Sequence, residues 1–176
     1  KGGLKTVLCN GIPNENMIFD KDVKAVVIAL KIRSAKKDES VREALAALKY
    51  LQQKGVRQFY FKYCSTFDST PKGNIGPVAD AILDALGETK SILCPALPEN
   101  GRTVKMGRLY VNGVPLDESP MKDHPVNPMG DSEICALMEP QSKYPCINVD
   151  VEEMKEEDEE IWNRLNAFED LNGKYY

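Results

Sequence analysis

The sequence predicts an α/β fold: a three-layer domain with a mostly parallel sheet, helices on both faces and a small hairpin insertion. Segments typical of strands and helices follow one another in the order strand, strand, helix, strand, helix, strand, which implies crossover connections. The first two expected strands are apolar almost throughout, as in a sheet covered on both faces. An Asn-Gly pair between two short apolar runs predicts the hairpin.

In the N-terminal half, residues 4–9 and 23–30 are predicted to form the first two strands. A helix is expected over about 40–54, because Ser40 and Glu43 form a capping-box pattern, apolar residues then recur at helical spacing, and Gly55 follows. Aromatic and β-branched residues predict a third strand over 56–63. A second helix over 75–86, ending at Gly87, and a fourth strand over 91–94 complete this half.

The C-terminal half is less regular and rich in proline up to residue 140. The expected hairpin pairs 109–111 with 114–116 around Asn112 and Gly113. Asp131 is a predicted N-cap for a short helix through Met138, and residues 146–149 resemble a fifth strand. A long charged helix is expected over 151–171, and its acidic run at 152–160 is interpreted as a solvated face, with partner binding as the alternative. Its expected inward side chains are Trp162, Leu165 and Phe168.

Composition excludes several classes of protein. The 176 residues include 23 Lys plus Arg and 27 Asp plus Glu, and the net charge of -4 lacks the cationic surface that nucleic-acid binders use. No apolar stretch approaches the roughly 20 residues that cross a bilayer, and no signal peptide is recognisable. The five cysteines show no metal-type spacing. We therefore expect a cytoplasmic protein with reduced thiols that uses no metal of its own and binds neither nucleic acid nor membrane.

Ligands of open α/β sheets bind at the carboxyl ends of the strands, so the loops that follow the strands are the places where a site is expected. After the second strand, Arg33 offers a planar fork of donors for a carboxylate or phosphate, and Ser34 offers a hydroxyl. A solvated surface arginine is the alternative interpretation.

The loop over 62–74 is the most polar segment between an expected strand and an expected helix. Its polar side chains are Lys62, Ser65, Thr66, Asp68, Ser69, Thr70, Lys72 and Asn74. Hydroxyls and amides suit sugar hydroxyl groups, lysines balance charge, and the free backbone N–H groups at the start of the following helix favour an anion. These features predict a site for a polyhydroxylated anion. An ordinary helix-capping loop is the alternative.

Two further loops hold candidates. Glu99, Asn100 and Arg102 follow the fourth strand and bring an acceptor, an amide and a cation together, although a structural turn at Asn100 and Gly101 explains them equally well. His124 is the only histidine, and it can serve as a donor, as a proton carrier or in a purely structural role. A single histidine disfavours a Ser-His-Asp triad and a zinc site.

Three strings of the sequence resemble the N-terminal domain of the four-carbon acid sugar kinase family, which includes the 3-oxo-tetronate, threonate and erythronate kinases. They are ALKIRS at 29–34, KYCSTFDSTPKGNIGPVADAILDAL at 62–86 and CPALPENGRTVKMGRLYVNGVPLDESPMKDHPVNPMGDS at 94–132. The resemblance covers at least residues 4–150. It implies carbohydrate metabolism and an ATP-dependent kinase that phosphorylates the terminal hydroxyl of a four-carbon sugar acid. In such enzymes the N-terminal domain holds the sugar acid, and a separate C-terminal domain binds ATP with Mg²⁺.

Carried onto matching positions, the resemblance implies a small-molecule sugar-acid site in the loops identified above. Its members are Arg33, Lys62, Ser65, Asp68, Lys72, Glu99, Asn100, Arg102 and His124. We expect Arg33 and Arg102 to bind the carboxylate, and Asp68 to accept a hydroxyl proton as the candidate catalytic residue. No residue of this chain is expected to bind the nucleotide.

The sequence also departs from the family pattern. The family's Asp-Asp motif (ADDxTGA-like) is expected just before Lys1, and the nucleotide-binding domain is expected beyond Tyr176. Residues 1–176 are therefore predicted to be a sugar-acid-binding domain truncated at both ends, inactive as a kinase by itself. The alternatives are a non-catalytic sugar-acid-binding or regulatory domain, and a truncated product that packs against a partner chain. An open sheet edge would favour association into a homo-oligomer.

Overall fold

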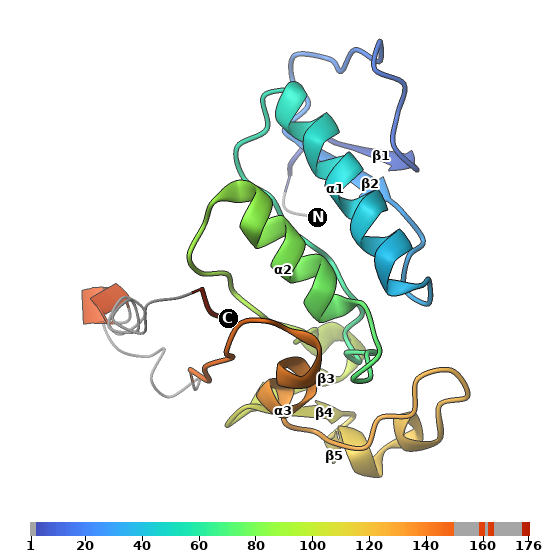
Figure 1. Ribbon diagram of the computed structural model, residues 1–176, viewed down its shortest axis with the longest axis vertical. Helices are drawn as coiled ribbons and strands as arrows, with labels where there is room; N and C mark the ends of the chain where they lie inside the picture. The colour runs from blue at the N-terminus through green and yellow to red at the C-terminus, as the bar shows by residue number, and fades with distance from the viewer. Residues whose placement is uncertain (1–2, 150–158, 161, 164–173) are drawn as a thin grey trace.

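The computed structural model describes residues 3–149, 159–160, 162–163 and 174–176. Its order of elements places a parallel strand pair and a helix first, a second helix in the middle, and an antiparallel hairpin with a short helix last (Figure 1). The elements are β1 (Thr6–Asn10), β2 (Ala25–Ala29), α1 (Lys37–Gln53), α2 (Ile75–Leu86), β3 (Arg102–Lys105), β4 (Arg108–Val111), β5 (Val114–Pro115) and α3 (Ile134–Met138).

β1 and β2 form a parallel sheet, as predicted, with a register in which Leu8 lies opposite Val27. The α/β class with a parallel sheet and helices is therefore confirmed. Cys9 points to the other face, where it is buried close to Tyr50 of α1. Leu8 is 66 % exposed and Val27 is 47 % exposed, so the described residues leave their face of the sheet largely uncovered.

Helix α1 begins three residues earlier than predicted. Ser40 is buried inside the helix, and its hydroxyl donates to the Lys36 carbonyl at 3.0 Å, so the predicted capping box at Ser40 is wrong. Asp38 and Glu39 lie in the first turn, where the helix dipole favours negative charge. Gly55 follows the helix with a φ of 80°, which confirms the predicted glycine stop.

Helix α2 has the predicted bounds. Its C-cap, Gly87, has a φ of 71°, a left-handed conformation in which glycine avoids the strain of a side chain. Pro77 lies in the first turn, where its missing N–H costs no intrahelical hydrogen bond. Ile75, Val78 and Leu83 are buried, so one apolar face of the helix packs into the protein.

Three predicted strands do not form. Residues 56–63 and 91–94 are not in strands. In the first of these segments, burial still alternates as it would in a strand: Phe59, Phe61 and Tyr63 are half-buried, whereas Tyr60 faces solvent. Alternation alone does not make a strand, because a strand also needs a hydrogen-bonded neighbour. Residues 146–149 also lack strand structure, although the Ile147 N–H donates to the Tyr176 carbonyl at 2.7 Å and the Tyr176 N–H donates to the Pro145 carbonyl at 2.9 Å.

The predicted hairpin is confirmed, with both Asn112 and Gly113 at positive φ, as a type I′ turn requires. The sequence prediction missed β3, which completes an antiparallel sheet of order β3-β4-β5. Helix α3 ends at Met138 as predicted, but the predicted N-cap at Asp131 is wrong, because the N-cap is Glu133. The Asp131 carboxylate instead accepts from the Glu133 N–H at 2.8 Å, in the turn before the helix.

Most of the helix expected over 151–171 lies outside the described residues, and so do Leu165 and Phe168. The described residues 159–160 and 162–163 are helical. Trp162 is 58 % exposed, so its predicted place on an inward face is wrong.

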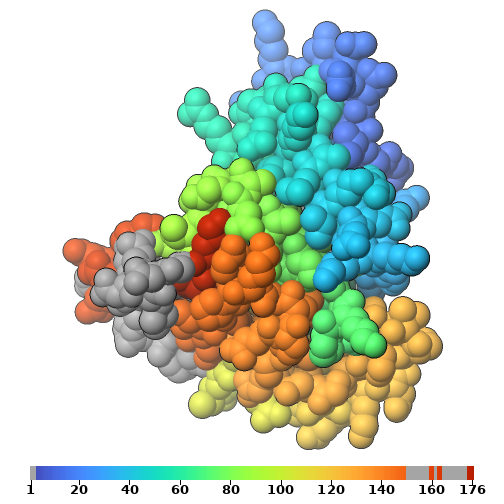
Figure 2. Space-filling view, viewed as in Figure 1, coloured from blue at the N-terminus to red at the C-terminus, as the bar shows by residue number. Residues whose placement is uncertain are grey.

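The main hydrophobic core lies between α2, the hairpin and α3. Its buried members are Phe67, Ile75, Leu83, Leu109, Val111, Leu116, Met129, Ile134, Leu137, Met138 and Tyr176. Figure 2 shows the orange surface of the chain around residue 140 lying directly against the green surface of α2. This packing brings residues from the last third of the chain next to the segment that precedes α2.

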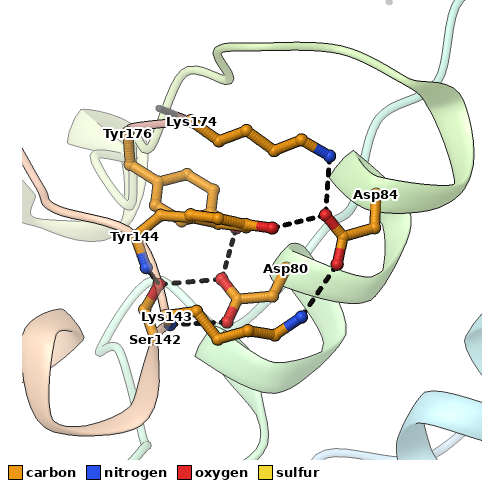
Figure 3. A network of polar contacts seen from close by, with 7 residues as sticks. All are labelled: Asp80, Asp84, Ser142, Lys143, Tyr144, Lys174 and Tyr176. Atoms are coloured by element: carbon orange, nitrogen blue, oxygen red, sulfur yellow. Dashed lines mark hydrogen bonds and ion pairs between the residues drawn. The ribbon is translucent and has the colours of Figure 1, made fainter. Parts of the chain in front are cut away.

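Two aspartates on α2 hold the C-terminal residues in place (Figure 3). The buried Asp80 accepts hydrogen bonds from the Ser142 hydroxyl at 2.7 Å and from the Tyr176 hydroxyl at 2.8 Å. One turn later, Asp84 accepts from Lys143 at 2.8 Å and from Lys174 at 2.6 Å. Burial, reinforced by the hydrogen bond to Asp80, raises the pKa of Tyr176.

Candidate functional site

The loop after β2 and the loop before α2 meet at an ion pair between Arg33 and Asp68. Arg33 Nη2 donates to Asp68 Oδ2, which raises the pKa of the Arg33 guanidinium. The Asp68 side chain is fully buried, whereas 57 % of the Arg33 side chain is exposed. A buried carboxylate therefore anchors a guanidinium that faces solvent.

Neighbouring loop residues hold Asp68 in place. Its Oδ1 accepts from the Thr66 hydroxyl at 2.5 Å, and its backbone N–H donates to the Cys64 sulfur at 2.9 Å. Burial raises the pKa of the Cys64 thiol. Phe67 has a φ of 48° and is completely buried. A left-handed conformation at a bulky residue costs about 1–3 kcal/mol and persists only where the surroundings fix it.

Asn74 joins the two loops. Its side-chain amide donates to the Ile32 carbonyl at 2.7 Å, to the Ala35 carbonyl at 3.1 Å and to the Ser40 hydroxyl at 3.0 Å. These carbonyls flank Arg33 in sequence. Asn74 therefore fixes the backbone that carries Arg33 against the start of α2.

The N–H groups at the start of α2 are not free to bind an anion, which corrects that part of the prediction. Ile75 N–H donates to the Ser69 hydroxyl at 3.3 Å, and Gly76 N–H donates to Gln141 Oε1 at 2.9 Å. The Ser69 hydroxyl itself donates to Gln141 Oε1 at 2.6 Å. Side chains of this chain thus occupy donors that the sequence suggested were available to a ligand.

The other candidates of this loop lie nearer the surface. Lys62 is exposed, and its ammonium donates to the neighbouring Tyr63 carbonyl. Lys72 is also exposed, and Ser65 is half-buried. These side chains border the Arg33–Asp68 pair along the chain, but they form no hydrogen bond with it among the described residues.

The remaining candidates lie around the hairpin. Glu99 and Asn100 are exposed in a short 3-10 turn, and Arg102 begins β3 and donates to the Asn100 carbonyl. This is the structural turn that the sequence left open as an alternative. His124 is half-buried, and its Nδ1 accepts from the N–H groups of Val126 and Asn127, so it stabilises a local turn.

The structure therefore brings together Arg33 and Asp68, and it groups Asn100 with Arg102 separately. No hydrogen bond or ion pair between described residues joins the two groups. The list of site residues predicted from the sequence leaves out Cys64, Thr66, Asn74 and Gln141, although Thr66 and Asn74 were counted among the polar side chains of this loop. Polar side chains in the same loop pointed to the first three, whereas no local signal pointed to Gln141, which is 72 residues from Ser69.

The described residues contain no group of three or more His, Cys, Asp or Glu side chains arranged to hold a metal ion. The N–H groups of Ile75 and Gly76, which could bind a phosphate, are already hydrogen-bonded. None of the described helices is both long and apolar enough to span a membrane.

Comparisons with known proteins agree with this architecture. Curated relatives named 3-oxo-tetronate kinase include one from Brucella melitensis, 56 % identical over 84 % of this chain and 33 % of the relative. One from Escherichia coli is 53 % identical over 83 % of this chain and 37 % of the relative. One from Pectobacterium atrosepticum is 49 % identical over 98 % of this chain and 40 % of the relative. The chain thus spans about a third to two fifths of the length of these relatives.

Two solved structures share the fold. A Haemophilus influenzae protein superposes with a TM-score of 0.91 at 43 % identity, covering 98 % of this chain and 42 % of that one. A Bordetella bronchiseptica protein was solved with bound citrate as a domain-swapped dimer. It superposes with a TM-score of 0.75 at 25 % identity, covering 94 % of this chain and 39 % of that one. The family model described as "Sugar-binding N-terminal domain" matches residues 1–175. With that match and this fold, the chain belongs to the family of sugar-binding N-terminal domains.

Proposed function

We propose that this chain binds a four-carbon sugar acid and forms the substrate-binding part of an ATP-dependent kinase that phosphorylates the terminal hydroxyl of that acid. The observation that supports this most is the anchored guanidinium of Arg33. Arginine has five N–H donors in a rigid fork, and Asp68 accepts through only one terminal nitrogen, Nη2. The exposed donors of Arg33 suit a carboxylate, which they can bind in two parallel hydrogen bonds.

Asp68 has a different role from the one that the sequence suggested. Thr66 and Arg33 already donate to its two oxygens, and the side chain is fully buried. We therefore propose that Asp68 orients Arg33, and that accepting a sugar hydroxyl is a secondary role, because the fully buried side chain exposes no oxygen to a ligand.

Side chains near this pair provide donors for the sugar hydroxyl groups. Ser65, Lys62 and Lys72 belong to the same loop and lie at or near the surface. We propose that the hairpin group, Glu99, Asn100 and Arg102, and His124 bind the other end of the acid in the complete site. Glu99 and Asn100 are exposed, and Arg102 and His124 are half-buried, so each keeps some surface that a ligand can reach.

The relatives support this proposal in two ways. Those aligned over most of this chain are named 3-oxo-tetronate kinase. The Bordetella bronchiseptica protein holds citrate, which is a small hydroxylated carboxylate. Because the chain spans at most two fifths of the three curated relatives compared above, we propose that ATP and Mg²⁺ bind outside these 176 residues. Phosphoryl transfer then depends on placing the nucleotide opposite the acid held here.

We also propose that the chain works in the cytoplasm and self-associates. The five cysteines are free, as is usual in a reducing compartment. The uncovered face that carries Leu8 and Val27 is a surface through which two copies could pack.

Isothermal titration of this chain with threonate and erythronate tests the proposal. Threitol and erythritol are matched controls, because they keep the hydroxyl groups and lack the carboxylate. We expect saturable heat from the acids and none from the polyols. No binding of any four-carbon acid, or equal binding of acids and polyols, would contradict the proposed function.

A further inference from the structure

Gln141 connects a distant part of the chain to the loop that carries Asp68. It is buried in the 3-10 turn Glu139–Gln141 that follows α3, and its side-chain amide uses both ends. Oε1 accepts from the Ser69 hydroxyl at 2.6 Å and from the Gly76 N–H at 2.9 Å, while the amide nitrogen donates to the Leu137 carbonyl at 2.8 Å. One side chain therefore joins the turn, the loop and the start of α2.

The packing around Gln141 is close on both sides. A Cβ atom at Gly76 would lie 2.7 Å from Gln141 Cγ and 2.7 Å from the Gln141 carbonyl oxygen. A Cβ atom at Gly73 would lie 2.0 Å from the Ser69 hydroxyl oxygen. Ser69 itself is completely buried. The loop is thus folded tightly around a hydroxyl group that Gln141 binds.

This arrangement bears directly on the candidate site, because Ser69 follows Asp68 and Phe67 precedes it in a left-handed conformation. A strained residue keeps its conformation only when its neighbours fix it. Fixing Ser69 fixes the backbone immediately after Asp68, and with it the direction in which the carboxylate points toward Arg33.

We propose that Gln141 is a positioning residue, which holds residues 67–76 in the conformation that directs Asp68 at Arg33 and thereby sets the affinity for the sugar acid. The effect on affinity rests on the proposed function. The effect on the loop does not, so the two can be measured separately.

Three variants of this chain test the proposal. Gln141→Met keeps the length of the side chain and removes its hydrogen bonds to Ser69 and Gly76. Gln141→Glu in its protonated form keeps an oxygen that can accept from Ser69 and Gly76 and a hydroxyl that can donate to the Leu137 carbonyl. Ser132→Ala is the matched control, because the Ser132 hydroxyl is fully buried and hydrogen-bonded to Asp117, and it forms no hydrogen bond with the loop among the described residues.

Hydrogen exchange followed by mass spectrometry measures the order of the loop. We expect peptides covering 67–76 to exchange about tenfold faster in Gln141→Met, which corresponds to ~1.4 kcal/mol of lost protection. Exchange there should stay near the unmodified rate in Gln141→Glu and Ser132→Ala. Unchanged exchange in Gln141→Met, or equal acceleration in Ser132→Ala, would overturn the positioning role.

Titration with the sugar acid measures the consequence for binding. The dissociation constant should rise about tenfold in Gln141→Met and stay within about twofold in Gln141→Glu. Equal affinity of Gln141→Met and the unmodified chain would overturn the link between Gln141 and the site. If the unmodified chain binds no acid, the proposed function is wrong, and the exchange measurement still decides whether Gln141 holds the loop.

Discussion

Arg33 donates from Nη2 to Oδ2 of Asp68, and the two partners differ in exposure, because the Asp68 side chain is fully buried and 57 % of the Arg33 side chain faces solvent. A buried carboxylate is stabilised by hydrogen bonds to its charged form. Here those come from Arg33 and Thr66. The pair holds the Arg33 cation in one direction at the surface, and among the described residues only the Nη2 atom of its guanidinium is hydrogen-bonded.

Asp68→Asn should lower both stability and affinity. The amide keeps the shape of the side chain but loses the negative charge and one acceptor. Because Arg33 is largely exposed, the expected loss of unfolding free energy is moderate, about 1–2 kcal/mol. Thermal unfolding measures the loss of stability, and titration with threonate measures the loss of affinity. An Asp68→Asn chain with unchanged affinity would show that the orientation of Arg33 does not depend on Asp68.

Gly76→Ala should be strongly destabilising. The added methyl group would lie 2.7 Å from the backbone of Gln141, so the start of α2 and the turn would have to separate. We expect a loss of about 2 kcal/mol or more, seen as a lower thermal midpoint.

Gly130→Ala is the matched control for this change. A Cβ atom at Gly130 meets nothing within 4 Å. The expected change is within about 0.5 kcal/mol. If both variants unfold at the temperature of the unmodified chain, the close approach of Gly76 and Gln141 is absent in solution.

Stability should depend on pH through Asp84. Hydrogen bonds from Lys143, Lys174 and Tyr144 hold the pKa of Asp84 below its ordinary value. A carboxyl with a lowered pKa stabilises the fold above its unfolded pKa of about 3.9, and this contribution is lost as the pH falls toward the folded pKa. Asp84→Asn should therefore cost about 0.5–1 kcal/mol at pH 7, a modest figure because the side chain is partly exposed.

Thermal unfolding between pH 7 and pH 3 checks this. The difference in midpoint between the unmodified chain and Asp84→Asn should be constant above about pH 5 and should narrow progressively below about pH 4. Asp123→Asn is the control, because Asp123 is exposed and has no side-chain hydrogen bond among the described residues. A difference that does not change with pH would contradict the role given to Asp84.

Self-association should depend on the uncovered face of the sheet. Leu8→Lys places a charge beside Val27 on this face, and light scattering should show a smaller average mass than for the unmodified chain. Ile18→Lys removes another apolar side chain, 90 % exposed, from outside the strands, and it should leave the mass unchanged. A monomeric unmodified chain would contradict the proposed association.

Helix ends and turns were predictable where local chemistry decides them. Gly87 ends α2 and Asn112-Gly113 forms the hairpin turn, because each requires positive φ at that position. Ser40 was misassigned because a serine inside a helix can donate back to a carbonyl four residues earlier, here that of Lys36.

Longer-range features could not be predicted in this way. Residues 56–63 have the alternation of a strand, but the presence of a hydrogen-bonded neighbour depends on the rest of the sheet. The loop of Asp68 was singled out by its density of polar side chains, and the structure places Asp68 against Arg33. The contact of this loop with Gln141 was not singled out, because only the packing of the turn Glu139–Gln141 against α2 brings the two together.

The most direct test of the proposed site compares Arg33→Leu with Arg42→Leu in titrations with threonate and erythronate. Arg42 is an exposed arginine on α1 outside the site, so the control makes the same chemical change. If Arg33 binds the carboxylate, Arg33→Leu should raise the dissociation constant about 10- to 100-fold while Arg42→Leu leaves it within about twofold. Equal affinity of Arg33→Leu and the unmodified chain would contradict the proposed site.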